Sequence, residues 1–194
     1  MPLSQVLRPA LRERELRGMD GWDLRAKYQQ LKALPLHEIT KTAFSPGPDQ
    51  HIGTEGEFAG WWTWPRDNFE THNGPFWHRV EEDGSIRCAF RVEKKHLNGS
   101  GNVHGGCFMA FADYCLYAIA SPLLEGRGVT THFACEFLDA GREGDLVAGT
   151  GEVTRGGGSL IFLRGQLKTG ERTLFTFSGT IKRVKRRAQL PADA

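Results

Sequence analysis

The residue in this chain best suited to chemistry is Asp113. It is the only charged residue in the apolar stretch from Cys107 to Leu124. A carboxylate buried without partners is destabilising unless its pKa rises until it is neutral, and such isolated acids concentrate at functional sites. We therefore predict that Asp113 is a functional acid. The alternative is a position at the rim of a helix, where the side chain meets solvent or an arginine.

A second group of candidates lies just before this stretch, in the segment Asn-Gly-Ser-Gly-Asn-Val-His-Gly-Gly at 98–106. Glycines before a helix let the backbone approach a ligand closely, and the first amides of the helix have no acceptors within it. Such amides can stabilise a developing oxyanion, and Gly106 is the best placed for this role. His104 could orient a substrate, cap the helix or fix the loop. Phosphate binding is a weaker alternative, because neither GxGxxG nor GxxxxGK[ST] is present.

Other kinds of active site are not supported by the sequence. The seven histidines show no metal-ligand spacing with acids or cysteines, so we expect no metal. A nucleophile elbow of the form GxSxG does not occur, which argues against a serine triad. The four cysteines lack CxxC spacing and lie in apolar runs, so we interpret them as reduced thiols that serve packing. They are Cys88, Cys107, Cys115 and Cys135.

These candidates must be positioned by a helix and a sheet. The stretch 107–124 is apolar on nearly every side, and a helix of this kind must be enclosed. Alternating apolar and polar residues, separated by short turns, predict antiparallel strands around it. The predicted strands are 76–80, 86–92, 130–137, 146–154, 160–169 and 172–184. One enclosed helix with such strands indicates an α+β fold in which a curved sheet wraps around the helix.

Composition narrows the range of functions. The chain has 194 residues, of which 39% are hydrophobic, as expected for a globular protein. Its 25 Lys and Arg nearly balance 23 Asp and Glu, so a globally basic nucleic-acid coat is excluded and we expect no nucleic-acid partner. The stretch 107–124 contains Asp113 and Pro122, so we expect no membrane span. We see no secretory signal, and Glu13 and Glu15 argue against a mitochondrial presequence, so we expect a cytoplasmic protein.

The chain divides into three parts by its residue composition and periodicity. Residues 1–68 form an N-terminal extension with helical patterns at about 4–17 and 21–34, followed by an aromatic-rich loop. In that loop lie Trp61, Trp62 and Trp64, for which we favour packing over lining a ligand pocket. Residues 69–187 carry the predicted sheet and helix, and 188–194 form a C-terminal tail.

The two groups of candidates together resemble a known family. Asn98-x-x-Gly101-x-x-His104-Gly105-Gly106, with Asp113 seven residues after the second glycine, is similar to the phenylacetate-degradation type of hotdog-fold thioesterase. The resemblance covers about 115 residues, from Asn-Gly-Pro-Phe at 73–76 through Gly-Asp at 144–145 to the last strand. It implies a hotdog fold, hydrolysis of an acyl-CoA thioester and no metal or redox cofactor. The extension lies outside the resemblance, and Asp139 stands where relatives commonly have proline.

The resemblance also implies roles for individual residues. Asp113 corresponds to the general base or nucleophile, and Gly106 to the amide that polarises the thioester carbonyl. Asn98 corresponds to a side chain that positions substrate or water, and His104 to one that supports the loop. Thr130 corresponds to a hydroxyl near the acid that could hold the attacking water.

In this family two subunits share each site, so the resemblance implies a homo-oligomer, either a dimer or a tetramer. Helical geometry is compatible with sharing, because Asp113 lies about 10 Å along the helix from Gly106, too far for one carbonyl to contact both.

Binding of CoA and the choice of substrate are less defined. Gly105, Arg155 and Gly157 are candidates for contacts with substrate or CoA, and the basic segment 182–187 could bind CoA phosphates or an acidic partner. The alternative for this segment is a strand end exposed to solvent. The alternative for the whole protein is a catalytically silent module that binds acyl-CoA or a partner protein. A hotdog hydratase or dehydratase, in which His104 would pair with Asp113, is a further alternative. The sequence leaves the acyl group open.

Overall fold

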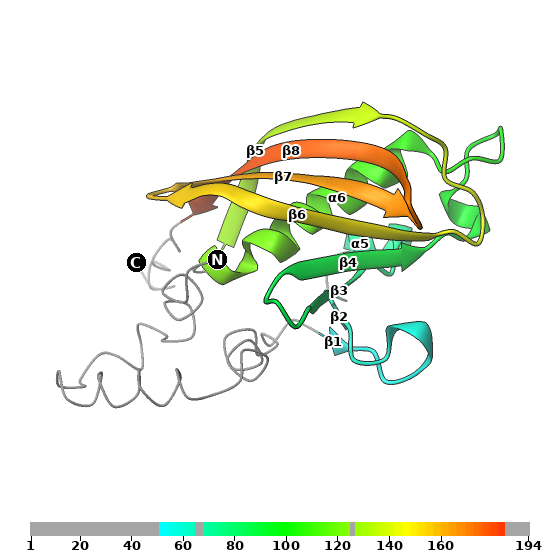
Figure 1. Cartoon of the computed structure of the whole chain (residues 1–194), viewed down its shortest axis with the longest axis horizontal. Helices are drawn as coiled ribbons and strands as arrows, with labels where there is room; N and C mark the ends of the chain where they lie inside the picture. Colours follow the sequence, from blue (N-terminus) through cyan, green and yellow to red (C-terminus); the bar gives the residue numbers. More distant parts are fainter. Residues whose placement is uncertain (1–50, 65–67, 125–126, 185–194) are drawn as a thin grey trace, which may run out of the picture.

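The computed structural model of the protein describes residues 51–64, 68–124 and 127–184. The helical patterns at 4–17 and 21–34 and the tail 188–194 therefore lie outside the described residues. The described residues form an antiparallel sheet that curves over one long helix, α6 (Figure 1). This architecture confirms the predicted α+β hotdog fold.

The sheet has eight strands in the order β1-β2-β3-β4-β6-β7-β8-β5, and every neighbouring pair is antiparallel. The strands are β1 His51–Ile52, β2 Trp62–Thr63, β3 Trp77–Val80, β4 Ile86–Arg91, β5 Arg127–Phe137, β6 Leu146–Gly157, β7 Leu160–Thr169 and β8 Arg172–Val184. All six predicted strands are present, with ends that differ by at most three residues. The strand order places β5 at one edge of the sheet, where it pairs with β8 along its length.

The central helix begins earlier than the sequence predicts. α6 spans Gly105–Ala120, and a 3₁₀ turn, Ser121–Leu123, follows it. One face is buried against the sheet by apolar side chains that include Phe111, Tyr114 and Leu116. The opposite face is not enclosed by the described part of the chain. Within the described residues the expected enclosure is therefore incomplete along a stripe of partly exposed residues, which are Gly106, Met109, Ala110, Asp113 and Tyr117.

Glycines in the sheet let α6 lie close to the strands. A Cβ atom at Gly149 on β6 would lie 2.4 Å from the Cys115 Sγ, and one at Gly179 on β8 would lie 2.4 Å from the Leu116 Cδ1. Real Cβ atoms essentially never approach another atom so closely, so a side chain at either position would push the helix off the sheet. The distance between α6 and the sheet, and with it the position of Asp113, therefore depends on these two glycines.

The segment before β3 contains more structure than the predicted loop. Strands β1 and β2 extend the sheet beyond β3, and a short helix, α5 Asn68–Asn73, precedes β3. The three tryptophans pack against aromatic and cationic neighbours, as the sequence analysis favours. Trp61 is 8% exposed with the Arg79 guanidinium over its ring, and Trp64 stacks on His78.

The stretch Gly105–Leu123 is long and apolar enough to cross a membrane by length and composition alone. More than half of it is buried inside the fold, where it forms the core helix of the described residues.

Candidate active site

Asp113 lies on the open face of α6, about midway along the helix, and is half-buried. The Thr130 hydroxyl on β5 donates a hydrogen bond of 2.8 Å to the Asp113 Oδ1. The predicted proximity of Thr130 to the acid is therefore present in the structure. A hydroxyl donor stabilises a carboxylate and fixes its orientation, so β5 aims the acid that α6 carries.

The surroundings of Asp113 form an open apolar groove of about 440 Å³. Its lining comprises Phe69 from α5, Gly106, Met109, Ala110 and Asp113 from α6, and Phe133 from β5. Asp113 is the only charged residue among them. A concave apolar surface with one aimed polar group is typical of a small-molecule site. The groove runs from Asp113 toward the start of the helix, since Gly106, Met109 and Ala110 all precede the acid.

The start of α6 is capped by a histidine. His104 is the N-cap residue, and its Nδ1 accepts a hydrogen bond of 2.9 Å from the Gly106 N–H. Of the three roles considered for His104, the structure shows capping. The amide predicted to polarise the substrate is therefore already engaged. The N–H of Gly105, the first residue of the helix, has no acceptor within the helix, and Phe137 packs so closely that a Cβ at Gly105 would lie 2.9 Å from its ring.

Asn98 shapes the loop that leads into α6. Its Oδ1 accepts hydrogen bonds from the backbone N–H of Ser100 at 2.9 Å and of Asn102 at 3.3 Å. A side chain that bonds the backbone two and four residues further on closes a tight turn. Asn98 does not line the groove around Asp113. Its carboxamide oxygen organises the loop, and a role in positioning substrate stays a prediction.

Tyr117 is a neighbour of the acid that the sequence analysis does not identify. It follows Asp113 by four residues and so lies on the same face of α6. Burial raises the pKa of the Tyr117 phenol, and a hydrogen bond with the Thr130 side chain opposes this rise. The i, i+4 spacing from Asp113 is the signal that could have revealed this residue. The open face of the helix therefore carries an acid, a phenol and, from β5, a hydroxyl.

Arg155 and Gly157 lie at the other end of the helix. A Cβ at the adjacent Gly156 would lie 2.6 Å from the Leu123 Cδ1, just after the end of α6. The 16 residues of α6 span about 24 Å, so these two candidates are far from Gly105 in the same chain. The structure does not bring them together with the groove.

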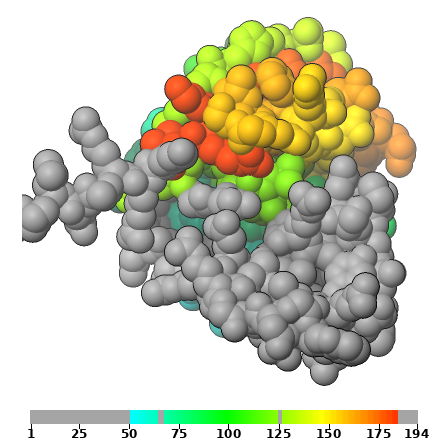
Figure 2. Space-filling model, turned by 90° about the vertical axis from the view of Figure 1, so that its left-hand side faces the viewer, coloured from blue at the N-terminus to red at the C-terminus, as the bar shows by residue number. Residues whose placement is uncertain are grey.

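Four cations gather where Arg155 lies. The segments 121–124, 127–131, 153–161 and 180–184 meet at this end of the sheet and contain no acidic residue. Their charged residues are Arg127, Arg155, Lys182 and Arg183. Figure 2 faces this end, where the tips of β5, β6, β7 and β8 come together. The Arg183 Nε donates to the Leu123 carbonyl at 2.8 Å, so this cation also secures the end of the helix. We refer to these four residues as the cationic end. Residues 185–187 of the basic segment lie outside the described residues.

Histidines, cysteines and acids do not form a metal cluster within 51–64, 68–124 and 127–184. The cysteines in these ranges are unpaired, and three of them are buried. Burial raises the pKa of the Cys107 thiol to about 11, which makes it a poor nucleophile. The groove around Asp113 is therefore the candidate active site of the described chain.

A curved antiparallel sheet over one long helix is the hotdog fold, and the acid on the helix with glycines at its start is the motif through which the sequence resembles hotdog-fold thioesterases. The family model described as the thioesterase superfamily matches residues 100–176. A Pseudomonas aeruginosa protein that carries the provisional name of an esterase is 32% identical over 108 residues, which cover 55% of this chain and 81% of the relative. The chain belongs to the thioesterase superfamily.

Solved structures share this fold. The PaaI protein of the Escherichia coli phenylacetic acid degradation operon has a TM-score of 0.56 and 22% identity over 63% of this chain and 88% of its own. A Streptococcus pneumoniae protein described as a hypothetical thioesterase, solved with coenzyme A, has a TM-score of 0.51 and 23% identity over 58% of this chain and 91% of its own. The resemblance found in the sequence is thus confirmed for the family and for the fold.

Proposed function

We propose that this protein hydrolyses an acyl-CoA thioester to a carboxylic acid and free CoA. The observation that carries the proposal is Asp113, the one charged residue lining an apolar groove, with the Thr130 hydroxyl donating to its carboxylate. Membership of the thioesterase superfamily and a fold neighbour solved with CoA support it.

Asp113 can act in either of two ways. As a general base it takes a proton from a water molecule whose oxygen bonds to the thioester carbon. The C–S bond then breaks, and the departing CoA thiolate takes up the proton. As a nucleophile its own oxygen bonds to that carbon and expels the thiolate, and water then hydrolyses the mixed anhydride. Both routes need the same carboxylate beside the carbonyl carbon.

The oxyanion is bound at the start of α6. We assign this role to the Gly105 N–H, because the Gly106 N–H donates to His104. For the Gly106 N–H to take the role that the resemblance implies, the His104 ring would have to give up that hydrogen bond. An amide at a helix start, aided by the helix dipole, is a suitable donor to negative charge that develops on the carbonyl oxygen.

Each site is shared by two copies of the chain. Asp113 and Gly105 are eight residues apart on one helix, or about 12 Å, so one carbonyl cannot contact both. The open stripe of α6 and the outer edge of β5 are free in the described chain to meet a second copy. If two β5 edges pair antiparallel about a twofold axis, the start of one strand meets the end of the other. Phe137, at the end of β5, packs on Gly105, so the Gly105 of one copy approaches the Asp113 of the other.

The cationic end binds the phosphates of CoA. Its charges have no acidic neighbour in the converging segments, and guanidinium groups are well suited to phosphate. Arg155 belongs to this end and Gly157 lies on the same strand two residues further on. The cationic end lies beyond Asp113 in the direction opposite to the groove.

The first experiment is release of free thiol from a panel of acyl-CoAs by the wild type and by Asp113→Asn. Loss of a general base lowers rates by about 10²–10⁴-fold, and circular dichroism serves as the control for folding. The thiols of the four cysteines must be subtracted from the signal. Near-normal turnover by the variant would refute the catalytic role of Asp113. Binding without release from any substrate favours the silent module, and a change in enoyl-thioester absorbance favours a hydratase.

Sharing of sites can be tested by mixing two inactive variants. Gly105→Pro removes the proposed N–H at the first helical position, where the φ of proline is tolerated and His104 already has extended backbone angles. Because a Cβ at Gly105 would lie 2.9 Å from the Phe137 ring, Phe137→Ala is made in the same chain, and Phe137→Ala alone is the active control. A mixed dimer of Gly105→Pro and Asp113→Asn has one intact site and one doubly defective site. If subunits exchange at random, half of the dimers are mixed and about a quarter of wild-type activity returns. Absence of recovery, with mixed dimers verified by mass spectrometry, contradicts sharing.

A further inference from the structure

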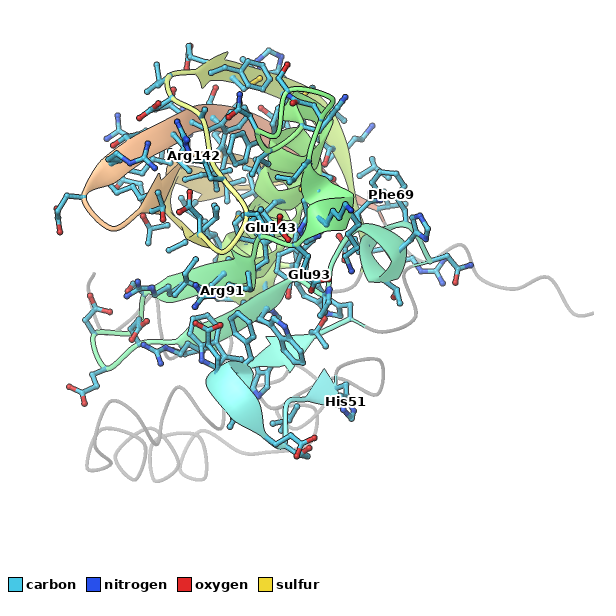
Figure 3. The ribbon with its side chains drawn as sticks, turned by 90° about the vertical axis from the view of Figure 1, so that its right-hand side faces the viewer. His51, Phe69, Arg91, Glu93, Arg142 and Glu143 are labelled. Atoms are coloured by element: carbon cyan, nitrogen blue, oxygen red, sulfur yellow. The ribbon has the colours of Figure 1, made fainter. Side chains whose placement is uncertain are left out.

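Phe69 is the most exposed large apolar side chain among the described residues, at 65%. Figure 3 looks onto the end of the molecule at which α6 begins, with Phe69 on the short helix α5 beside it. Leaving a phenyl ring in water forgoes the gain in free energy that its burial would bring. A single exposed aromatic needs no explanation by itself, but this one lines the groove that contains Asp113.

α5 is held firmly at its C-terminal end, so Phe69 is not at the tip of a loose loop. The His96 ring, which is 4% exposed, hydrogen bonds through Nε2 to the Asn73 carbonyl at 2.7 Å. The Lys95 ammonium donates to the Gly74 carbonyl. The Asn73 side chain donates back to the Phe69 carbonyl at 2.8 Å. These contacts tie α5 to the segment 94–97 and thereby fix the backbone that carries the ring.

The position of the groove along α6 indicates which part of a substrate would fill it. The cationic end lies beyond the C-terminal end of α6, whereas the groove extends from Asp113 toward the N-terminal end. In the shared site proposed above, a thioester whose carbonyl lies at Asp113 and whose CoA extends to the cationic end would direct its acyl group along the groove, between this chain and the second copy that meets the open stripe of α6. The side chains that it would meet there are Phe69, Met109 and Phe133.

We infer that Phe69 contacts the acyl group and is a specificity-determining residue that favours uncharged hydrocarbon acyl groups longer than acetyl. This inference rests on the proposed function. The groove lining contains no cation, and its one charge is the Asp113 carboxylate. A second carboxylate on the acyl group would therefore find like charge and no partner. Hydrocarbon beyond the α-carbon would cover the Phe69 ring and remove apolar surface from water.

The test compares kcat/KM for acetyl-, butyryl-, hexanoyl- and succinyl-CoA in the wild type, Phe69→Ala and Phe162→Ala. Phe162 is the matched control, because it is also an exposed phenylalanine (40%) but lies on β7 and does not line the groove. We expect Phe69→Ala to lower kcat/KM for hexanoyl-CoA about tenfold, with a loss that shrinks as the chain shortens. Phe162→Ala should leave the profile unchanged. The wild type should prefer butyryl- over succinyl-CoA by more than about tenfold.

Three results would overturn the inference. One is an equal loss for all acyl groups in Phe69→Ala, another is no loss, and the third is dissociation of the oligomer, which would make Phe69 a subunit contact.

A binding measurement separates this inference from the proposed function. In calorimetry, the thioether hexyl-CoA, which cannot be hydrolysed, should bind more tightly than CoA, and Phe69→Ala should remove most of that difference. If no thioester is hydrolysed but this difference is found, the proposed function fails and the acyl contact of Phe69 stands. If hydrolysis occurs and the difference is absent in the wild type, the inference about Phe69 fails alone.

Discussion

The two faces of α6 serve different purposes: one face stabilises the fold, and the other carries the candidate catalytic residue. On the buried face, Phe111, Tyr114 and Leu116 are fully buried against the sheet. On the open face, Met109 is 42% exposed and Asp113 lies in a groove. The difference teaches that a helix can place a reactive acid accurately because its other face is fixed by packing. Substitutions on the two faces should therefore affect different properties, and each prediction below tests that separation.

The largest effect on stability is expected on the buried face. Leu116→Ala should lower the free energy of unfolding by about 2–5 kcal/mol, because it leaves a cavity between α6 and β8. Asp113→Asn should change it by less than about 0.5 kcal/mol, as for a partly exposed site without a packing role. Urea denaturation of both variants measures the contrast. Equal destabilisation by the two changes would mean that the faces are not separable.

The next effect is a dependence of stability on pH that arises from His78. This residue is 2% exposed, and its Nδ1 lies 2.7 Å from the Tyr114 hydroxyl on the buried face of α6. Burial lowers the pKa of His78 to about 3. Between that value and about 6.5 the unfolded chain binds a proton that the folded protein does not, so stability falls as the pH falls.

From pH 7 to pH 5 the loss in the free energy of unfolding attributable to His78 should be about 2 kcal/mol. His78→Gln cannot take up this proton, so its free energy of unfolding should fall less over the same interval. The measurement is urea denaturation at pH 7 and pH 5 for both proteins, in which all other titrating groups are common. Parallel losses would show that His78 does not carry the effect.

A smaller effect is expected on the open face, at Thr130. Thr130→Val keeps the shape of the side chain but removes the donor to the Asp113 carboxylate. We expect kcat to fall about tenfold, as for loss of one hydrogen bond to a charged group, with KM nearly unchanged. Thr130→Ser keeps the hydroxyl and should retain most of the activity. An equal loss in both variants would point to packing of the methyl group and not to the hydrogen bond.

Much of this architecture could be predicted from the sequence, because burial on one side of a strand or a helix leaves a periodic pattern. Alternation in β7 and β8 reveals which residues face the helix, and the lone charge within 107–124 marks the acid. The family resemblance predicted that Thr130 lies near Asp113, and the structure shows a hydrogen bond between the two side chains.

Other features leave no such pattern. Hydrophobicity shows that the face of α6 around Met109 avoids water but not whether the same chain or a second copy covers it. The bond from Gly106 to His104 depends on the rotamer of one side chain. Phe69 lies on a helix of six residues, too short for a periodic signal, and its relation to Asp113 depends on the contacts that anchor α5.

The outer edge of β5 has a practical consequence for anyone who handles this protein. Eleven residues long, it offers a row of backbone donors and acceptors that a strand of any other chain could pair with. Val129, at 48% exposed, adds apolar surface near its start. Variants engineered to be monomeric by disrupting pairing at this edge should therefore lose solubility unless lysine or proline is introduced on the strand at the same time.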